Sequence, residues 1–182
     1  WEQEIAAHLK PYTLGHFRRA YGPDLRKLRL SKDKESRTGL PSLDLEGLKQ
    51  PGIVATTYET LRDYQHSFCR VDWSVLVMDE VQKIKNPATR ATDAAKAVKA
   101  NFRVALTGTP VENSLTDLWC IVDGVQPGFL GSLKVFNQRY GVGQEKPDNV
   151  SSLQELLTGE HDGMPPVMLR RMKQEGHIEG LP

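Results

Sequence analysis

Two adjacent acidic residues, Asp79 and Glu80, follow directly on an apolar run, Ser74–Met78. A short run of this kind is typical of a strand buried in a parallel sheet. Ligands of open α/β sheets bind outside the carboxyl ends of the strands, where these carboxylates would lie. One carboxylate can hold a hard cation such as Mg²⁺ while the other polarises a water. The pattern predicts nucleotide-phosphate chemistry at Asp79 and Glu80, although such a pair more often only caps the next helix.

A second polar turn, Thr107-Gly108-Thr109-Pro110, follows another β-type run, Phe102–Leu106. By itself this turn is ordinary, because glycine frees the backbone and proline restricts it. If the two runs are neighbouring parallel strands, the turn meets the acids and Gln82 at one edge of the sheet. Hydroxyl groups beside the acids can sense a γ-phosphate and couple nucleotide state to movement of the following segment.

The elements around these turns alternate between β-type and helical patterns, which favours a parallel α/β sheet flanked by helices. Residues 25–50 are polar and irregular, and we expect them to form a surface excursion. Beyond Glu112 the pattern indicates helices, beginning with Leu115–Val125. The expected strands are Tyr12–Phe17, Ile53–Thr57, Ser74–Met78 and Phe102–Leu106, and the other expected helices are Trp1–Leu9, Tyr58–Phe68 and Thr89–Ala100.

The composition describes a globular chain of 182 residues, with 38% hydrophobic and 26% charged side chains. No apolar stretch approaches the length that spans a bilayer, and the first residues lack the features of a signal peptide. The two cysteines are far apart, without metal-ligand spacing, so we expect a reducing intracellular setting, cytoplasmic if bacterial and nuclear if eukaryotic. A net charge of +1 means that any contact with DNA is local.

Several strings follow one another in order over nearly the whole chain: Trp1–Ile5, Ile53–Leu61, Val77–Asn86, Ala105–Leu115, Gln126–Gly131 with Phe136 and Tyr140, and Met168–Pro182. Together they resemble the Swi/Snf-type DNA-translocating ATPases of helicase superfamily two. The resemblance is loosest over residues 25–50 and 142–163. It implies a RecA-like P-loop NTPase fold, with ATP and Mg²⁺ as cofactors and double-stranded DNA as a partner contacted through its backbone.

The resemblance also implies roles for individual residues. Asp79 would hold the Mg²⁺ bound to ATP, and Glu80 would orient the attacking water. Gln82 stands at the last position of this motif, where the family varies, and would contact the nucleotide. The turn after the next strand would couple ATP state to DNA tracking, through Thr107, Gly108 and Thr109.

A further set of residues would contact DNA phosphates: Thr56, Thr57, Tyr58, Lys85, Asn86 and Asn113. Each has a plainer alternative. The two threonines can simply end a strand, Tyr58 can belong to the core, Lys85 can be a surface charge, and Asn86 can cap a helix.

The string GxxxxGK[ST] does not occur in these residues, so the backbone cradle for phosphates is missing. Nothing resembles a second RecA-like lobe. We therefore expect an incomplete first lobe (1–125), a helical appendage (126–164) and the start of a linker to a second lobe (165–182). Such a piece should expose apolar surface and be inactive alone. The alternatives are a strand-separating helicase of the same superfamily, on DNA or RNA, and a non-catalytic interaction module.

Overall fold

The computed structural model describes residues 1–10, 13–30, 40–50, 52–109, 114–141, 147–160 and 163–170. It separates into two compact units, Trp1–Pro110 and Val111–Pro182. We describe each unit by itself.

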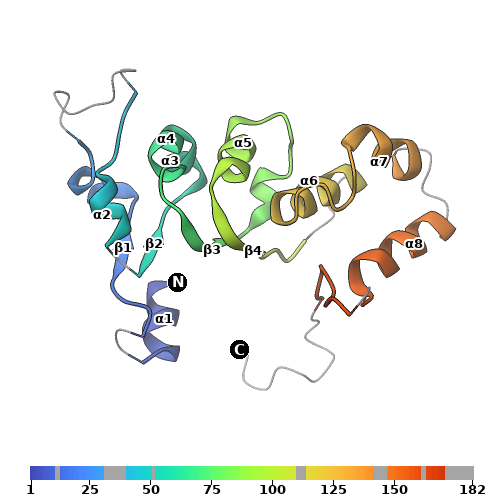
Figure 1. Ribbon diagram of the computed structural model, residues 1–182, viewed down its shortest axis with the longest axis horizontal. Coiled ribbons are helices and arrows are strands. Elements are labelled where there is room, and N and C mark those ends of the chain that lie inside the picture. Colours follow the sequence, from blue (N-terminus) through green and yellow to red (C-terminus); the bar gives the residue numbers. More distant parts are fainter. Residues whose placement is uncertain are drawn as a thin grey trace. The chain divides into compact units, whose positions relative to one another are not determined.

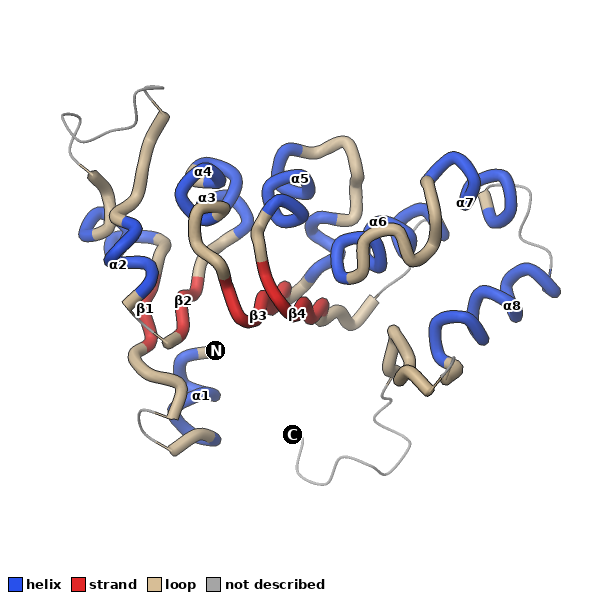
Figure 2. The backbone as a smooth tube through the Cα atoms, in the orientation of Figure 1, coloured by secondary structure: helices blue, strands red, loops and turns tan. Residues whose placement is uncertain are grey.

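The first unit holds four described strands that form two parallel pairs (Figures 1 and 2). Strand β1 (Phe17–Arg19) pairs with β2 (Ile53–Ala55), and β3 (Trp73–Met78) pairs with β4 (Ala100–Ala105). The predicted parallel arrangement is confirmed. The helices of this unit are α1 (Glu2–His8), α2 (Leu45–Lys49), α3 (Tyr58–Asp63), α4 (Gln65–Phe68) and α5 (Arg90–Ala97), with 3₁₀ turns η1 (Gly22–Lys27) and η3 (Val81–Ile84).

Side-chain caps define where three of these helices begin. Asp44, Thr57 and Thr89 each stand directly before a helix, and each side chain accepts a hydrogen bond from a backbone N–H of the first turn. A capped N-terminus satisfies a donor that the helix itself leaves unpaired. The caps therefore place the starts of α2, α3 and α5 from local sequence alone.

The expected strand Tyr12–Phe17 is wrong in its position. Strand β1 begins only at Phe17, residues 13–16 are not part of a strand, and Tyr12 lies outside the described residues. The backbone of Gly52 passes so close to this segment that an added Cβ would lie 1.3 Å from the Leu14 carbonyl oxygen. Ile53 N–H then donates to His16 O, so pairing starts one residue before Phe17.

Three leucines anchor the described part of residues 25–50, the segment expected to be a surface excursion. Leu28, Leu43 and Leu48 are 2% exposed or less. The backbone N–H of Leu43 donates to the Ser67 hydroxyl at 2.9 Å, which fixes the segment against α4. The leucines are widely spaced along a polar sequence, so their burial leaves no periodic pattern to detect.

The helices α3, α4 and α5 lie on one side of the strands (Figure 1). Met78 of β3 is buried, as are Ala94 and Ala95 of α5. The paired strands β3 and β4 carry exposed apolar side chains as well, since Val75, Val77 and Phe102 are 51%, 51% and 63% exposed. Exposed apolar surface was expected of an incomplete lobe, and it lies on this β3–β4 pair.

The described elements of the second unit are helices, and this unit begins at Val111, before the expected boundary at residue 125. Helix α6 (Leu115–Val125) has the predicted bounds, and α7 (Leu133–Tyr140) and α8 (Pro147–Thr158) follow it. Their shared core includes Leu118, Trp119, Phe136, Tyr140, Leu153 and Leu157. Among the described residues, no helix combines the length and apolar character needed to cross a membrane.

Candidate active site

The pairing of β3 with β4 brings the two predicted polar turns together. Met78 and Ala105 are register partners at the carboxyl ends of these strands. Leu106 N–H donates to Met78 O at 2.8 Å, and Val81 N–H donates to Leu106 O at 3.0 Å. Backbone hydrogen bonds therefore join the turn after β3 to the turn after β4, one just before and one just after Asp79 and Glu80.

Asp79 is held by three hydrogen bonds. Its Oδ1 accepts from the backbone N–H of Glu80 at 3.0 Å, and its Oδ2 accepts from Trp1 Nε1 at 2.8 Å. Its carbonyl oxygen accepts from the Tyr58 hydroxyl at 2.8 Å. Three separate segments thus fix both the backbone and the carboxylate of this residue.

Glu80 adopts the left-handed backbone conformation, with φ 49° and ψ 48°. It is the one non-glycine residue of the described segments with a positive φ. This conformation costs a side-chain-bearing residue about 1–2 kcal/mol, and such strain is concentrated at functional sites. Here it turns the chain sharply from β3 into η3, so that consecutive carboxylates project from the strand end.

A hydrogen-bonded bridge links Glu80 to the turn after β4. The Gln82 side-chain amide donates to a Glu80 carboxylate oxygen, and its carbonyl oxygen accepts from the Thr107 hydroxyl at 2.7 Å. Thr107 Oγ1 in turn accepts from the backbone N–H of Thr109 at 3.1 Å. Gly108 is exposed beside this bridge, and a Cβ there would meet nothing within 4 Å.

The electrostatic environment keeps Tyr58 protonated. Burial raises the pKa of the Tyr58 hydroxyl above its ordinary range, and the carboxylates of Asp79 and Glu80 raise it further. A phenol is a donor only while it holds its proton. The raised pKa therefore maintains the donation from Tyr58 to the Asp79 carbonyl.

The donor set suits Mg²⁺ that arrives with a phosphate. Both carboxylates are exposed, and the described residues contain no group of three or more His, Cys, Asp and Glu side chains that could hold a metal. Mg²⁺ sites commonly use one or two carboxylates, several waters and substrate phosphates instead of a full protein cage. Asp79 and Glu80 fit this kind of site.

Several residues predicted to contact DNA make local hydrogen bonds, and α5 is capped by Thr89 instead of Asn86. Thr56 Oγ1 donates to Ala20 O at 3.0 Å, and Thr57 caps α3. Asn86 Oδ1 accepts from Ala88 N–H at 2.9 Å, as a turn residue. Lys85 is half-buried, and Asn113 lies outside the described residues.

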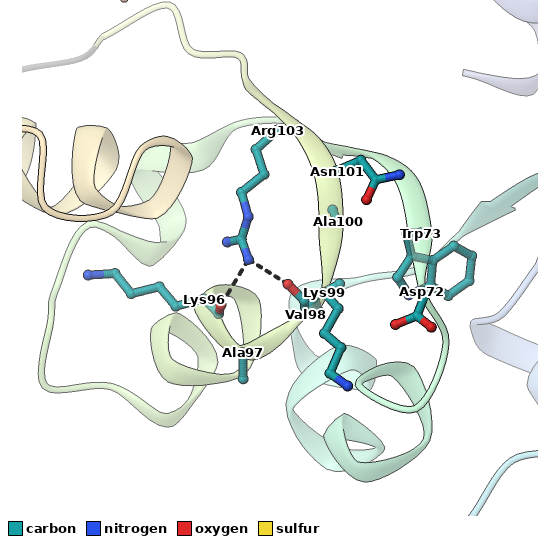
Figure 3. A pocket seen from close by; sticks show the side chains of 9 residues that line it. All are labelled: Asp72, Trp73, Lys96, Ala97, Val98, Lys99, Ala100, Asn101 and Arg103. Atoms are coloured by element: carbon teal, nitrogen blue, oxygen red, sulfur yellow. Dashed lines mark hydrogen bonds between the residues drawn. The ribbon is translucent and has the colours of Figure 1, made fainter.

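A pocket of about 430 Å³ lies elsewhere, at the beginning of β3 and β4 (Figure 3). Asp72 and Trp73 line it from one strand, and Asn101 and Arg103 from the other. The Arg103 guanidinium donates to Val98 O at 2.5 Å and to Lys96 O at 3.1 Å, carbonyls at the end of α5. The pocket contains none of the predicted site residues.

The sequence pattern missed Trp1 as a contact of the site. It is separated from Asp79 by 78 positions, and no local spacing connects the two. The bridging role of Gln82 was also not foreseen, although its place beside the acids was.

Comparison with known proteins identifies relatives of this chain. The profile of the SNF2-related domain matches residues 1–182. Zorya protein ZorD of Escherichia coli is 42% identical over 182 residues, which is 96% of this chain and 16% of that protein. TATA-binding protein-associated factor mot1 of Aspergillus fumigatus is 33% identical over 183 residues, covering 96% of this chain and 9% of its own.

A solved structure shows the same fold. The Sulfolobus solfataricus SWI2/SNF2 ATPase core in complex with dsDNA matches with a TM-score of 0.65 and 28% identity, over 87% of this chain and 29% of that chain. The present chain thus spans less than a third of the relatives and the structure that it matches here. It belongs to the SNF2-related domain family and has part of the RecA-like fold of a SWI2/SNF2 ATPase core.

Proposed function

We propose that this chain is the acid-bearing part of the first RecA-like lobe of a motor that hydrolyses ATP to move along double-stranded DNA. The observation that carries the proposal is the bridge from Glu80 through Gln82 to Thr107. It connects the carboxyl ends of two neighbouring parallel strands, where ligands of such sheets bind.

In this proposal the carboxylates of Asp79 and Glu80 have different roles. Asp79 holds Mg²⁺ bound to ATP, and this cation supplies neutralisation of the phosphate charge. Glu80 orients and activates the attacking water. The hydrogen bonds from Trp1 and Glu80 N–H keep the Asp79 carboxylate turned toward the strand end. Positioning of this kind accounts for most of what a protein contributes to phosphoryl transfer.

The Gln82 amide couples hydrolysis to movement. Its donor side contacts Glu80 and its acceptor side contacts Thr107, so any change in the position of the Glu80 carboxylate alters the hydrogen bond to Thr107. Thr107 also holds the Thr109 backbone N–H. A displacement at Glu80 can therefore reach the segment that follows β4.

The DNA partner is proposed to be held through its phosphates. Candidate contacts lie after β2 and after η3, at Thr56, Thr57, Tyr58, Lys85 and Asn86, together with Asn113. The hydroxyl of Tyr58 already bonds to Asp79 O, so its position would link the DNA side to the acids. Contacts with phosphates give sequence-independent and salt-sensitive binding. The bound duplex in the Sulfolobus solfataricus structure supports this partner.

A second lobe in the full-length protein is the proposed source of the transition-state arginine. The 182 residues contain no GxxxxGK[ST] string either. These residues alone are therefore expected to show no turnover of ATP.

The test measures Mg·ATP turnover by the full-length protein with and without duplex DNA. We expect DNA to stimulate turnover, and Glu80→Gln to reduce it by about 100-fold or more, which is the usual contribution of a general base. Glu59→Gln is the matched control, because Glu59 is an exposed acid on α3. Full activity in the Glu80→Gln protein would overturn the assignment, and separation of the strands would show a helicase instead of a translocase.

A further inference from the structure

The pocket at the beginning of β3 and β4 lies apart from the candidate active site (Figure 3). Its volume of about 430 Å³ falls within the range of roughly 300–1,000 Å³ that is usual for ligand pockets. The strand β3 has 6 residues, so its two ends are roughly 16 Å apart at about 3.3 Å per residue. A ligand of the pocket can therefore bind without touching Asp79 or Glu80.

Three segments of the chain meet at this pocket. The Trp73 backbone N–H donates to Lys99 O at 3.1 Å, and Trp73 is the register partner of Ala100. This pairing brings Asp72 and Lys99, the residues just before the two strands, to the pocket on neighbouring segments. The end of α5 supplies the third wall.

Arg103 holds a positive charge at a fixed place in the pocket. Its guanidinium donates to Val98 O at 2.5 Å and to Lys96 O at 3.1 Å, both at the end of α5. Figure 3 shows this side chain extended from β4 to the two carbonyls. Because these bonds already order the guanidinium, a ligand that contacts it does not have to immobilise a free side chain.

The lining residues carry more positive than negative charge. Lys96, Lys99 and Arg103 are basic, and Asp72 is the single acidic residue of the described lining. Lys99 and Asp72 are exposed, and neither side chain forms an ion pair with another described residue. Both groups are therefore available to a ligand, and the net charge of the lining attracts anions.

The mixed lining favours a peptide over a small molecule or a nucleic acid. Asp72, Lys99 and Asn101 are exposed, so a small ligand would not be enclosed as it is in most ligand pockets. The phosphates of a nucleic acid would be repelled by the Asp72 carboxylate. A peptide with acidic side chains carries carboxylates for the basic residues and backbone N–H groups that Asp72 can accept.

We propose that this pocket binds an acidic segment of a partner protein. Asp or Glu side chains of the segment pair with Lys99 and Arg103, and one of its backbone N–H groups donates to Asp72. Asn101 adds an amide that can donate or accept a hydrogen bond. The inference does not depend on the proposed function, because none of these residues belongs to the proposed ATP or DNA sites.

The first test measures the binding of fluorescein-labelled octaglutamate to the full-length protein by fluorescence anisotropy. We expect saturable binding, and we expect Lys99→Glu to raise the dissociation constant by about tenfold or more, since it places like charges together. Lys134→Glu is the matched control, because Lys134 is an exposed lysine of α7 outside the pocket. Equal affinities of the two variants, or no binding to the unsubstituted protein, would overturn the proposal.

A competition experiment separates a peptide site from a general surface for polyanions. Saturating duplex DNA is added to the complex of the full-length protein with labelled octaglutamate. We expect most of the peptide to stay bound, because the pocket and the proposed DNA contacts after η3 lie at opposite ends of β3. Complete displacement of the peptide by DNA would count against a peptide site.

Chemical cross-linking locates the bound peptide. A carbodiimide activates a carboxylate of N-acetylated octaglutamate, and an adjacent lysine amine then forms an amide bond as the carbodiimide leaves as a urea. We expect mass spectrometry to find the peptide on Lys96 or Lys99, and not on Lys134. Cross-links spread evenly over the exposed lysines would show that the peptide has no defined site.

Discussion

At the scale of single residues, the site depends on side chains that fix the acids rather than on the acids alone. Asp79 is bonded by Trp1, by Tyr58 and by the backbone of Glu80. Glu80 adopts a backbone conformation that glycine would adopt more easily. At position 80, the left-handed backbone is most stable with glycine, whereas the proposed chemistry requires a carboxylate side chain.

Replacing Glu80 tests this conflict. The left-handed conformation strains any side chain with a Cβ, so we expect Glu80→Gly to be about 1 kcal/mol more stable than Glu80→Ala. Urea unfolding of the full-length protein measures the difference. Asp93 of α5 is the control, since glycine in a helix is less stable than alanine by roughly 0.5–1 kcal/mol. The same order at both positions would contradict the assigned strain.

At the scale of elements, the parallel pairing of β3 with β4 determines which turns meet. Both strands end in polar turns, and the pairing brings Gln82 of the first turn within 2.7 Å of the Thr107 hydroxyl of the second. The contact depends on a hydroxyl at position 107. The volume of the Thr107 side chain matters less than its hydroxyl, because residue 107 is only partly buried.

Thr107→Val tests the coupling proposed for this contact. Valine has nearly the shape of threonine but cannot donate to Gln82 Oε1. We expect the full-length variant to bind ATP normally while the stimulation of turnover by DNA falls several-fold, on the order of tenfold. Thr107→Ser retains the hydroxyl and should restore the stimulation. Unchanged stimulation in Thr107→Val would show that the bridge does not carry the coupling.

At the scale of the whole chain, the first unit exposes a row of apolar side chains on its strands. Val75 and Phe102 are register partners and Val77 follows on the same face, all at least 51% exposed. Exposed apolar patches on a sheet favour association with other surfaces. The 182 residues studied alone are therefore expected to self-associate through this face.

Sedimentation of the 182-residue chain over a range of concentrations tests this expectation. Val77→Glu places a charge in the centre of the row, so we expect the dissociation constant for self-association to rise by about tenfold or more, a change of roughly 1.4 kcal/mol. Val135→Glu is the matched control, because Val135 is 59% exposed on α7 of the other unit. A monomeric unsubstituted chain would contradict the prediction.

The sequence by itself determined the features that depend on local pattern. The apolar run before Asp79 predicted β3, and the bounds of Leu115–Val125 were correct. The alanine-rich pattern predicted α5, which ends at Ala97 and not at Ala100. The ordered strings indicated the family, and the parallel order placed Thr107 near the acids. Each of these follows from side-chain periodicity, capping or strand direction, which act over a few residues.

Only the tertiary structure decided the contacts between distant segments. It placed Trp1 on Asp79, buried Leu28 and Leu43 in a segment with no periodic pattern, and gave Glu80 its left-handed backbone. It also placed β2 and β3 in separate two-stranded sheets within the described residues. Such features depend on which surfaces meet after the chain has folded, and no local spacing of residue types encodes them. The sequence therefore predicted Asp79 and Glu80 as site residues, but it did not predict that Trp1 and Tyr58 would hold Asp79 in place.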